Sequence, residues 1–158
     1  YQTGEPIPAE IVERIIAAQN YLAAYLNVRQ LSFGLTDMAW HTITEPFEGD
    51  VEQFEVASMA PSQVQPVVPG TAMAPAFGHI FSGGYAAGYY GYKWAEVLEA
   101  DAFSLFKEKG IFNREVSGSF RENILSKGGT EHPMELYVRF RGHKPETKAL
   151  IEKMGLGK

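Results

Sequence analysis

The chain has 158 residues, of which 45% are hydrophobic and 13% aromatic, so it can bury a packed core. Its 14 basic and 19 acidic side chains give a net charge of -5 without a cluster of lysine and arginine, which excludes nucleic acid as an expected partner. The absence of cysteine excludes disulfides, thiolate metal sites and a cysteine nucleophile. No apolar run approaches the roughly 20 residues that span a bilayer, so we expect a soluble protein with no membrane partner.

Two helices are predicted before residue 44. The first covers residues 8–27, where apolar side chains recur every three or four positions and form one face of an amphipathic helix: Ile11, Ile15, Ala18, Leu22 and Leu26. The second covers residues 30–43, although Gly34 weakens the pattern. Asp37 and His41 are four positions apart in it, which predicts an ion pair or hydrogen bond within the helix.

A Pro/Gly-rich loop is predicted near residues 60–84, because proline and glycine interrupt any periodic pattern there. Further helices are expected over residues 84–109, 114–125, 133–140 and 145–154, with Gly110 ending the first of them. Thr130 or Glu131 is expected to cap the helix that starts at Pro133. Since only residues 64–68 offer a short β-branched stretch, the fold class is all-α.

Residues 78–92 read GHIFSGGYAAGYYGY and combine five glycines, four tyrosines and a histidine. In a helix from Gly84, glycines would form one stripe, and Tyr85, Tyr89, Tyr92 and Glu96 would form the next. The phenols would then either pack in a core or line a cleft, where neutral hydroxyls can stabilise an oxyanion. Spacing alone favours packing, and it also favours a core position for His79 beside Phe77 and Ile80.

The run from Phe77 to Tyr92 resembles the glycine-rich substrate loop of the zinc metallopeptidase family of thimet oligopeptidase, oligopeptidase A and bacterial peptidyl-dipeptidase. The resemblance covers nearly the whole chain, through residues 3–8, 29–31, 37–41, 93–97, 110–113, 124–129 and 139–142. It implies that residues 1–158 are the C-terminal segment of the catalytic region in a larger helical zincin-type peptidase. The implied substrates are short peptides.

The resemblance also implies roles for individual residues. Tyr92, Tyr85 and His79 would be catalytic, contacting the scissile carbonyl, with Tyr92 the main oxyanion donor. A further group would bind substrate, with glycines that let the loop close over it: Tyr89, Gly83, Gly84 and Gly88.

The family binds one zinc ion through His-Glu-x-x-His, but the histidines here are at 41, 79, 132 and 143, and no two are four apart. The resemblance therefore implies that the zinc-binding helix is missing and that the zinc ligands lie in the N-terminal part of the full-length protein. We expect no cofactor in this chain and no peptidase activity from it alone.

The alternative is a non-catalytic helical module that binds peptides or associates with itself. Within the family, internal cleavage and release of C-terminal dipeptides both remain open. The expected location is the cytoplasm, with the periplasm as the alternative.

Overall fold

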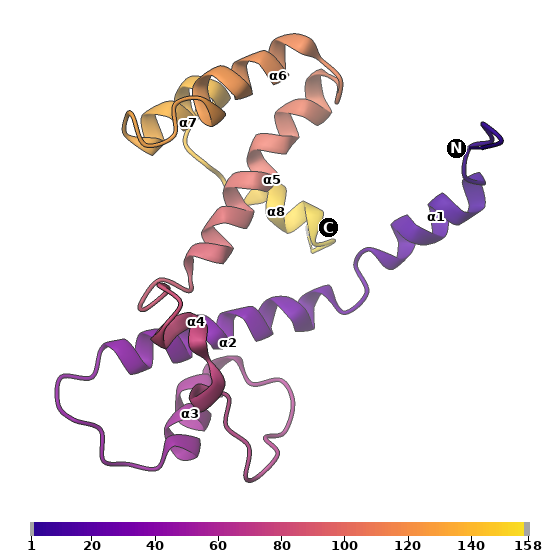
Figure 1. Ribbon diagram of the computed structural model, residues 1–158. Coiled ribbons are helices and arrows are strands. Elements are labelled where there is room, and N and C mark those ends of the chain that lie inside the picture. The colour runs from indigo at the N-terminus through magenta and orange to yellow at the C-terminus, as the bar shows by residue number, and fades with distance from the viewer. Residues whose placement is uncertain (1, 157–158) are drawn as a thin grey trace. The chain divides into compact units, whose positions relative to one another are not determined.

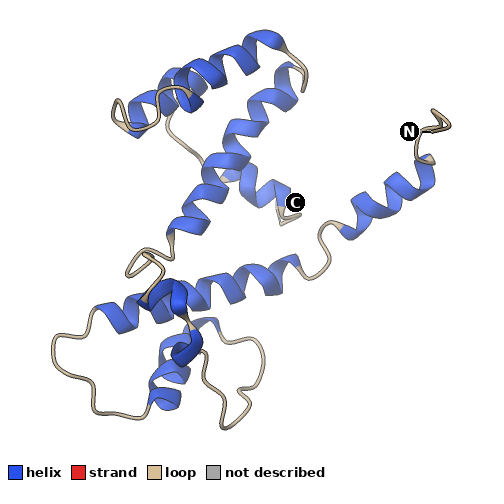
Figure 2. Ribbon diagram, viewed as in Figure 1, coloured by secondary structure: helices blue, strands red, loops and turns tan. Residues whose placement is uncertain are grey.

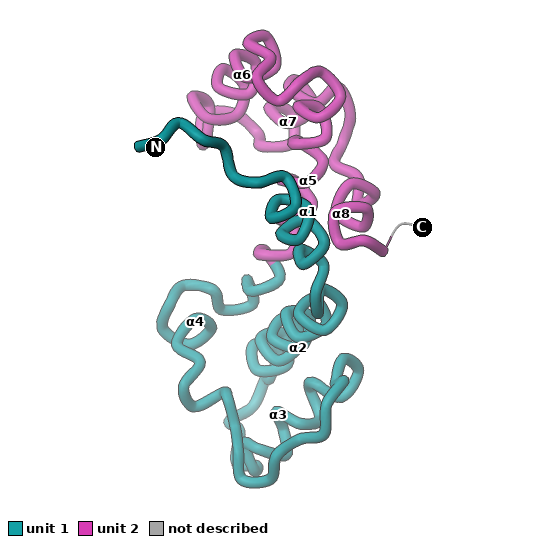
Figure 3. Tube along the Cα trace, turned by 90° about the vertical axis from the view of Figure 1, so that its right-hand side faces the viewer, with its two compact units in different colours: residues 1–90 teal, residues 91–158 magenta. Residues whose placement is uncertain are grey.

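The computed structural model describes residues 2–156, and the chain separates into two compact units, residues 1–90 and residues 91–158 (Figure 3). Every regular element within the described range is helical, and residues 64–68 form no strand (Figure 2). The predicted all-α class is confirmed. No helix in this range is both long enough and apolar enough to cross a membrane.

The first unit begins with α1 (Ala9–Ala18) and α2 (Ala23–His41), shown in Figure 1. The single helix predicted over residues 8–27 is wrong, because Leu22 adopts a left-handed φ of 56° that no continuous α-helix accommodates. The second predicted helix is confirmed, although it starts earlier and ends at His41. Gly34 does not interrupt it.

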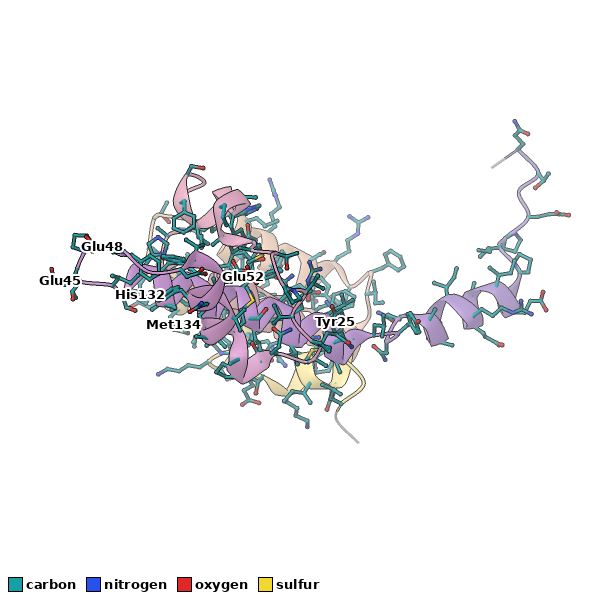
Figure 4. The ribbon with its side chains drawn as sticks, turned by 90° about the horizontal axis from the view of Figure 1, so that it is seen from below. Tyr25, Glu45, Glu48, Glu52, His132 and Met134 are labelled. Carbon is teal, nitrogen blue, oxygen red and sulfur yellow. The ribbon has the colours of Figure 1, made fainter. Side chains whose placement is uncertain are left out.

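Helix α3 (Val51–Met59) was not predicted, since its apolar pattern is weak. Asp50 caps its N-terminus, and the Asp50 carboxylate accepts a hydrogen bond from the Gln53 N–H at 2.9 Å. It packs on α2, where the buried Thr36 hydroxyl lies 3.1 Å from the Ser58 hydroxyl. In the loop between the two helices, Glu45 and Glu48 lie at the outer end (Figure 4).

The Pro/Gly-rich loop is largely irregular, as predicted, with three short helical pieces: η1 (Ala60–Ser62), η2 (Ala74–Ala76) and α4 (Gly78–Phe81). Glu55, a buried carboxylate of α3, accepts hydrogen bonds from the N–H groups of Met73 and Ala74. The loop is therefore tied to α3 through its backbone.

The second unit is built on α5 (Gly91–Lys109). The predicted start at residue 84 is wrong, because Gly84 (φ 84°) and Ala87 (φ 52°) are left-handed and residues 83–90 form turns. The glycine and tyrosine stripes that a helix would create therefore do not exist. The predicted end is confirmed, since Gly110 follows with a φ of 105°.

The remaining helices are α6 (Arg114–Phe120), which continues as the π-helix η3 (Arg121–Leu125), α7 (Pro133–Arg141) and α8 (Lys148–Lys153). The helices predicted over residues 114–125 and 133–140 match closely, and α8 is shorter than the predicted 145–154. The predicted cap of α7 is wrong: His132 caps it, accepting from the Met134 N–H at 3.2 Å. Glu131 instead pairs with Arg139 at 2.7 Å.

The core of the second unit gathers side chains from α5, α6 and α7: Ala102, Val116, Tyr137 and Phe140. A second small cluster joins α8 to α5 through Val97, Ala100 and Leu150. Tyr137 carries the one polar group of the main cluster, and its hydroxyl donates to Asp101 Oδ2 at 2.6 Å. Arg141 binds the Asp101 backbone carbonyl at 3.0 Å, which completes a buried polar network.

Candidate functional site

The tyrosine loop, residues 83–90, is a chain of tight turns that follows α4. Its backbone is closed by two hydrogen bonds, from the Tyr85 N–H to the His79 carbonyl at 3.1 Å and from the Gly88 N–H to the Tyr85 carbonyl at 2.8 Å. A Cβ at Gly83 would lie 3.0 Å from the His79 backbone, so only glycine allows this close approach. The glycines here shape the loop itself.

A buried carboxylate of α2 holds the loop. Asp37 is fully buried, and its Oδ1 accepts from the Ala87 N–H at 2.9 Å while its Oδ2 accepts from the Tyr89 N–H at 2.8 Å. His41 Nδ1 lies 2.9 Å from Asp37 Oδ1, which confirms the predicted contact within the helix. The link from Asp37 to the loop was not foreseen, because its partners are 50 and 52 residues away in sequence.

His79 and Tyr85 lie side by side at the surface, with ring centroids 6.0 Å apart. The core position that spacing alone favours for His79 is wrong, because Phe77 and Ile80 are buried while His79 is exposed. Tyr85 is 40% exposed. The structure thus brings together two of the three predicted catalytic side chains and leaves both accessible to a ligand.

Tyr89 is more enclosed than Tyr85. Its hydroxyl donates to Gln30 Oε1 at 2.9 Å, and its ring packs edge-on against Phe33 and Phe77 at 5.8 and 5.4 Å. Burial raises the pKa of Tyr89, and the nearby Arg29 charge and the Gln30 hydrogen bond partly oppose this rise. Its ring and hydroxyl therefore attach the tyrosine loop to α2.

Tyr92 belongs to the second unit, where it lies in the first turn of α5 and is 39% exposed. Tyr90, which precedes it at the end of the first unit, is 63% exposed. Tyr92 therefore sits on a regular helix, whereas Tyr85 sits on a turn.

The described residues do not fit a zinc site. Between residues 2 and 156, no three His, Asp or Glu side chains are grouped so that they could hold a metal ion. Three of the histidines have other partners: His41 contacts Asp37, His132 caps α7, and His143 Nδ1 lies 2.7 Å from the Lys144 carbonyl.

An apolar pocket of about 680 Å³ lies within the second unit. Its walls come mainly from α5 and α7, and its aromatic lining residues are Trp94, Phe103, Phe106, Phe120 and Tyr137. The pocket could not be predicted from the sequence, because its lining residues are scattered over more than 40 positions and share no motif.

The all-helical fold agrees with the helical class of peptidase that the sequence resembles. Residues 1–156 match Peptidase family M3, and the chain belongs to that family.

Among curated relatives, it is 49% identical over 159 residues to oligopeptidase A of Escherichia coli K12 and 40% identical over 161 residues to a probable cytosolic oligopeptidase A of Arabidopsis thaliana. It is 36% identical over 156 residues to a dipeptidyl carboxypeptidase of Salmonella typhimurium. These alignments cover 98–99% of the chain and 23% of each relative, so the chain spans about a quarter of their length.

Proposed function

We propose that this chain is the carbonyl-binding segment of a peptidase that hydrolyses short peptides. Membership of Peptidase family M3 supports the reaction class. The observation that carries the proposal is the exposed pair of His79, in α4, and Tyr85, in the tyrosine loop whose backbone a buried carboxylate holds at Ala87 and Tyr89. Preorganised donors of this kind stabilise charge that develops on a carbonyl oxygen without reorganising during the reaction.

Each predicted site residue has a role in this proposal. Tyr92 and Tyr85 donate hydrogen bonds to the scissile carbonyl oxygen as it becomes negative, with Tyr92 the principal donor. His79 contacts the substrate beside Tyr85. Tyr89 has the weaker role, because Gln30 already accepts from its hydroxyl.

Gly83, Gly84 and Gly88 contact the substrate in this proposal by letting its backbone approach a loop without side chains at these positions. The Gly83 and Gly88 N–H groups already donate to the Gly78 and Tyr85 carbonyls, so these two groups shape the loop.

We assign the zinc ligands to the remainder of the full-length protein, since the described residues do not fit a metal site. In such enzymes zinc activates the attacking water. A chain that holds only carbonyl donors lacks that nucleophile, so the 158-residue chain alone is inactive.

The test is hydrolysis of a fluorogenic short peptide by the full-length protein and by the isolated chain. The full-length protein is expected to show turnover that a chelator abolishes, and the isolated chain none, even with added zinc. Chelator-sensitive turnover by the isolated chain would refute the assignment of the metal ligands. Absence of turnover by the full-length protein would contradict the proposed reaction.

The greater identity to oligopeptidase A than to dipeptidyl carboxypeptidase favours an oligopeptidase, and internal cleavage is the specificity that we propose for it. With a blocked octapeptide, the full-length protein should release internal fragments of several lengths. Release of dipeptides from the C-terminus alone would favour the other specificity. The proposed location is the cytoplasm, which agrees with the name of the probable cytosolic oligopeptidase A of Arabidopsis thaliana, whereas a second Arabidopsis relative of 40% identity is named organellar.

A second candidate is a helical module that binds peptides or self-associates, which the apolar pocket of the second unit favours. Light scattering of the isolated chain distinguishes the two. A stable dimer, together with no gain of activity on mixing with the N-terminal part of the protein, would support the module. Restored hydrolysis in the mixture would support the peptidase.

A further inference from the structure

We infer that Asp37 is a positioning residue that holds the tyrosine loop in its left-handed turn at Ala87 and thereby sets the orientation of Tyr85. The inference rests on the proposed function, because it assigns Tyr85 to the substrate carbonyl. Asp37 itself is fully buried, so we assign it no contact with substrate.

The geometry at Ala87 requires an anchor. Ala87 has a φ of 52°, a conformation that its methyl group disfavours and that glycine would adopt freely. The Ala87 N–H donates to Asp37 Oδ1 at 2.9 Å, so the carboxylate binds the strained residue directly. Hydrogen bonds to an ionised acceptor are among the stronger ones in proteins, and burial strengthens this one further.

The anchor is reinforced from both sides. Asp37 Oδ2 takes the Tyr89 N–H at 2.8 Å, and the Tyr89 hydroxyl reaches Gln30, which lies seven positions before Asp37 and so on the same face of α2. His41 Nδ1 lies 2.9 Å from Oδ1, the same oxygen that accepts from the Ala87 N–H. The loop is thus fixed to α2 at three points within three residues.

The turn transmits this position to Tyr85. The Gly88 N–H donates to the Tyr85 carbonyl at 2.8 Å, so residues 85–88 form one closed turn with Ala87 inside it. A change of φ at Ala87 would open that turn and rotate Tyr85 away from His79. Strained backbone of this kind persists only where its surroundings enforce it, and it concentrates at functional sites.

The test uses the full-length protein and the variant Asp37→Asn. Its amide nitrogen would face one of the two loop N–H groups, so only one of the two hydrogen bonds survives. We expect kcat to fall by roughly 30-fold with KM nearly unchanged, since misplacing a reacting group by about 1 Å costs up to about 100-fold. Hydrogen exchange of residues 83–90 should accelerate in the same variant, while zinc content stays constant.

Two comparisons separate positioning from a general loss of structure. Asp50→Asn is the matched control, because Asp50 also accepts a backbone N–H but asparagine caps a helix equally well, so kcat should not change. Ala87→Gly combined with Asp37→Asn should recover part of the lost kcat, since glycine adopts the left-handed turn without the anchor. Absence of any recovery would overturn the stated role of Asp37.

The outcomes are distinct. If Asp37→Asn has wild-type kcat and unchanged hydrogen exchange in residues 83–90, the inference is overturned. The proposed function survives that result if Tyr85→Phe still lowers kcat. If Tyr85→Phe has no effect, the proposed role of Tyr85 fails instead. Should Asp37→Asn not fold, Ala87→Val decides: it keeps the carboxylate and opposes the turn, so a lowered kcat supports the inference and an unchanged one overturns it.

Discussion

Glu55 offers the sharpest test of how the Pro/Gly-rich loop is held. Its carboxylate is 8% exposed and receives the Met73 N–H at 2.8 and 2.9 Å and the Ala74 N–H at 2.6 Å. In Glu55→Gln, one side-chain oxygen remains, and at the Oε2 position it can still accept from both N–H groups. The amide N–H₂ group then replaces Oε1, 2.8 Å from the Met73 N–H, and this buried contact between two donors costs about 2 kcal/mol. Local opening of the loop should therefore become roughly 30-fold more frequent.

Hydrogen exchange measured by mass spectrometry on residues 70–77 of the full-length protein reports this opening. Glu52→Gln is the matched control on the same helix, because its more exposed carboxylate accepts a single hydrogen bond, from the Gly70 N–H at 2.8 Å. Its effect should stay below about fivefold, the range of an ordinary hydrogen bond near solvent. Equal exchange rates in wild type and Glu55→Gln would show that the buried carboxylate does not hold the loop.

Two further predictions concern the second unit. Burial raises the pKa of Tyr137, and the hydrogen bond and negative charge of Asp101 raise it further. The native state therefore keeps a proton that the unfolded chain releases near pH 10. The contribution of this proton to the free energy of unfolding is fully present below about pH 10 and is lost as the pH rises above it. Tyr137→Phe should lower the free energy of unfolding by about 1–3 kcal/mol at pH 7 and remove part of its decline at alkaline pH. Urea titrations at several pH values from about 7 to 11 would show this as a weaker dependence of the free energy of unfolding on pH. Phe140→Ala should cost about 3–5 kcal/mol, because Phe140 is 6% exposed within the main cluster; a urea midpoint that does not move would contradict its place in the core.

The helices of the second unit were predictable because local chemistry determines them. Gly110 ends α5, Asn113 caps α6 with its side chain, and Pro133 occupies the first turn of α7. Such cues act within a few residues and can be read directly from the chain. Helix α3 was missed because its only clear local cue is the cap at Asp50.

The tyrosine loop was not predictable in the same way. Residues from Tyr85 to Tyr92 have helical spacing, and only the left-handed backbone at Gly84 and Ala87 prevents a helix. Ala87 has no intrinsic preference for that conformation, which depends on a carboxylate 50 residues earlier. A contact over that distance leaves no trace in local periodicity, so tertiary structure overrides the pattern.

The family could be recognised from the sequence because several motifs occur in the right order along nearly the whole chain, and the match over residues 1–156 confirms it. The roles of Tyr92, Tyr85 and His79 remain proposals. All three side chains are exposed, and those of Tyr85 and His79 lie close together.

The most direct test of the central claim is kcat of the full-length Tyr92→Phe variant on a short fluorogenic peptide. Removing one oxyanion donor should lower kcat by roughly 100-fold or more with zinc content unchanged. Tyr90→Phe, which removes the hydroxyl of a 63% exposed tyrosine two positions earlier, should leave kcat at the wild-type value. A Tyr92→Phe variant with wild-type kcat would contradict the account and leave Tyr92 as a packing residue.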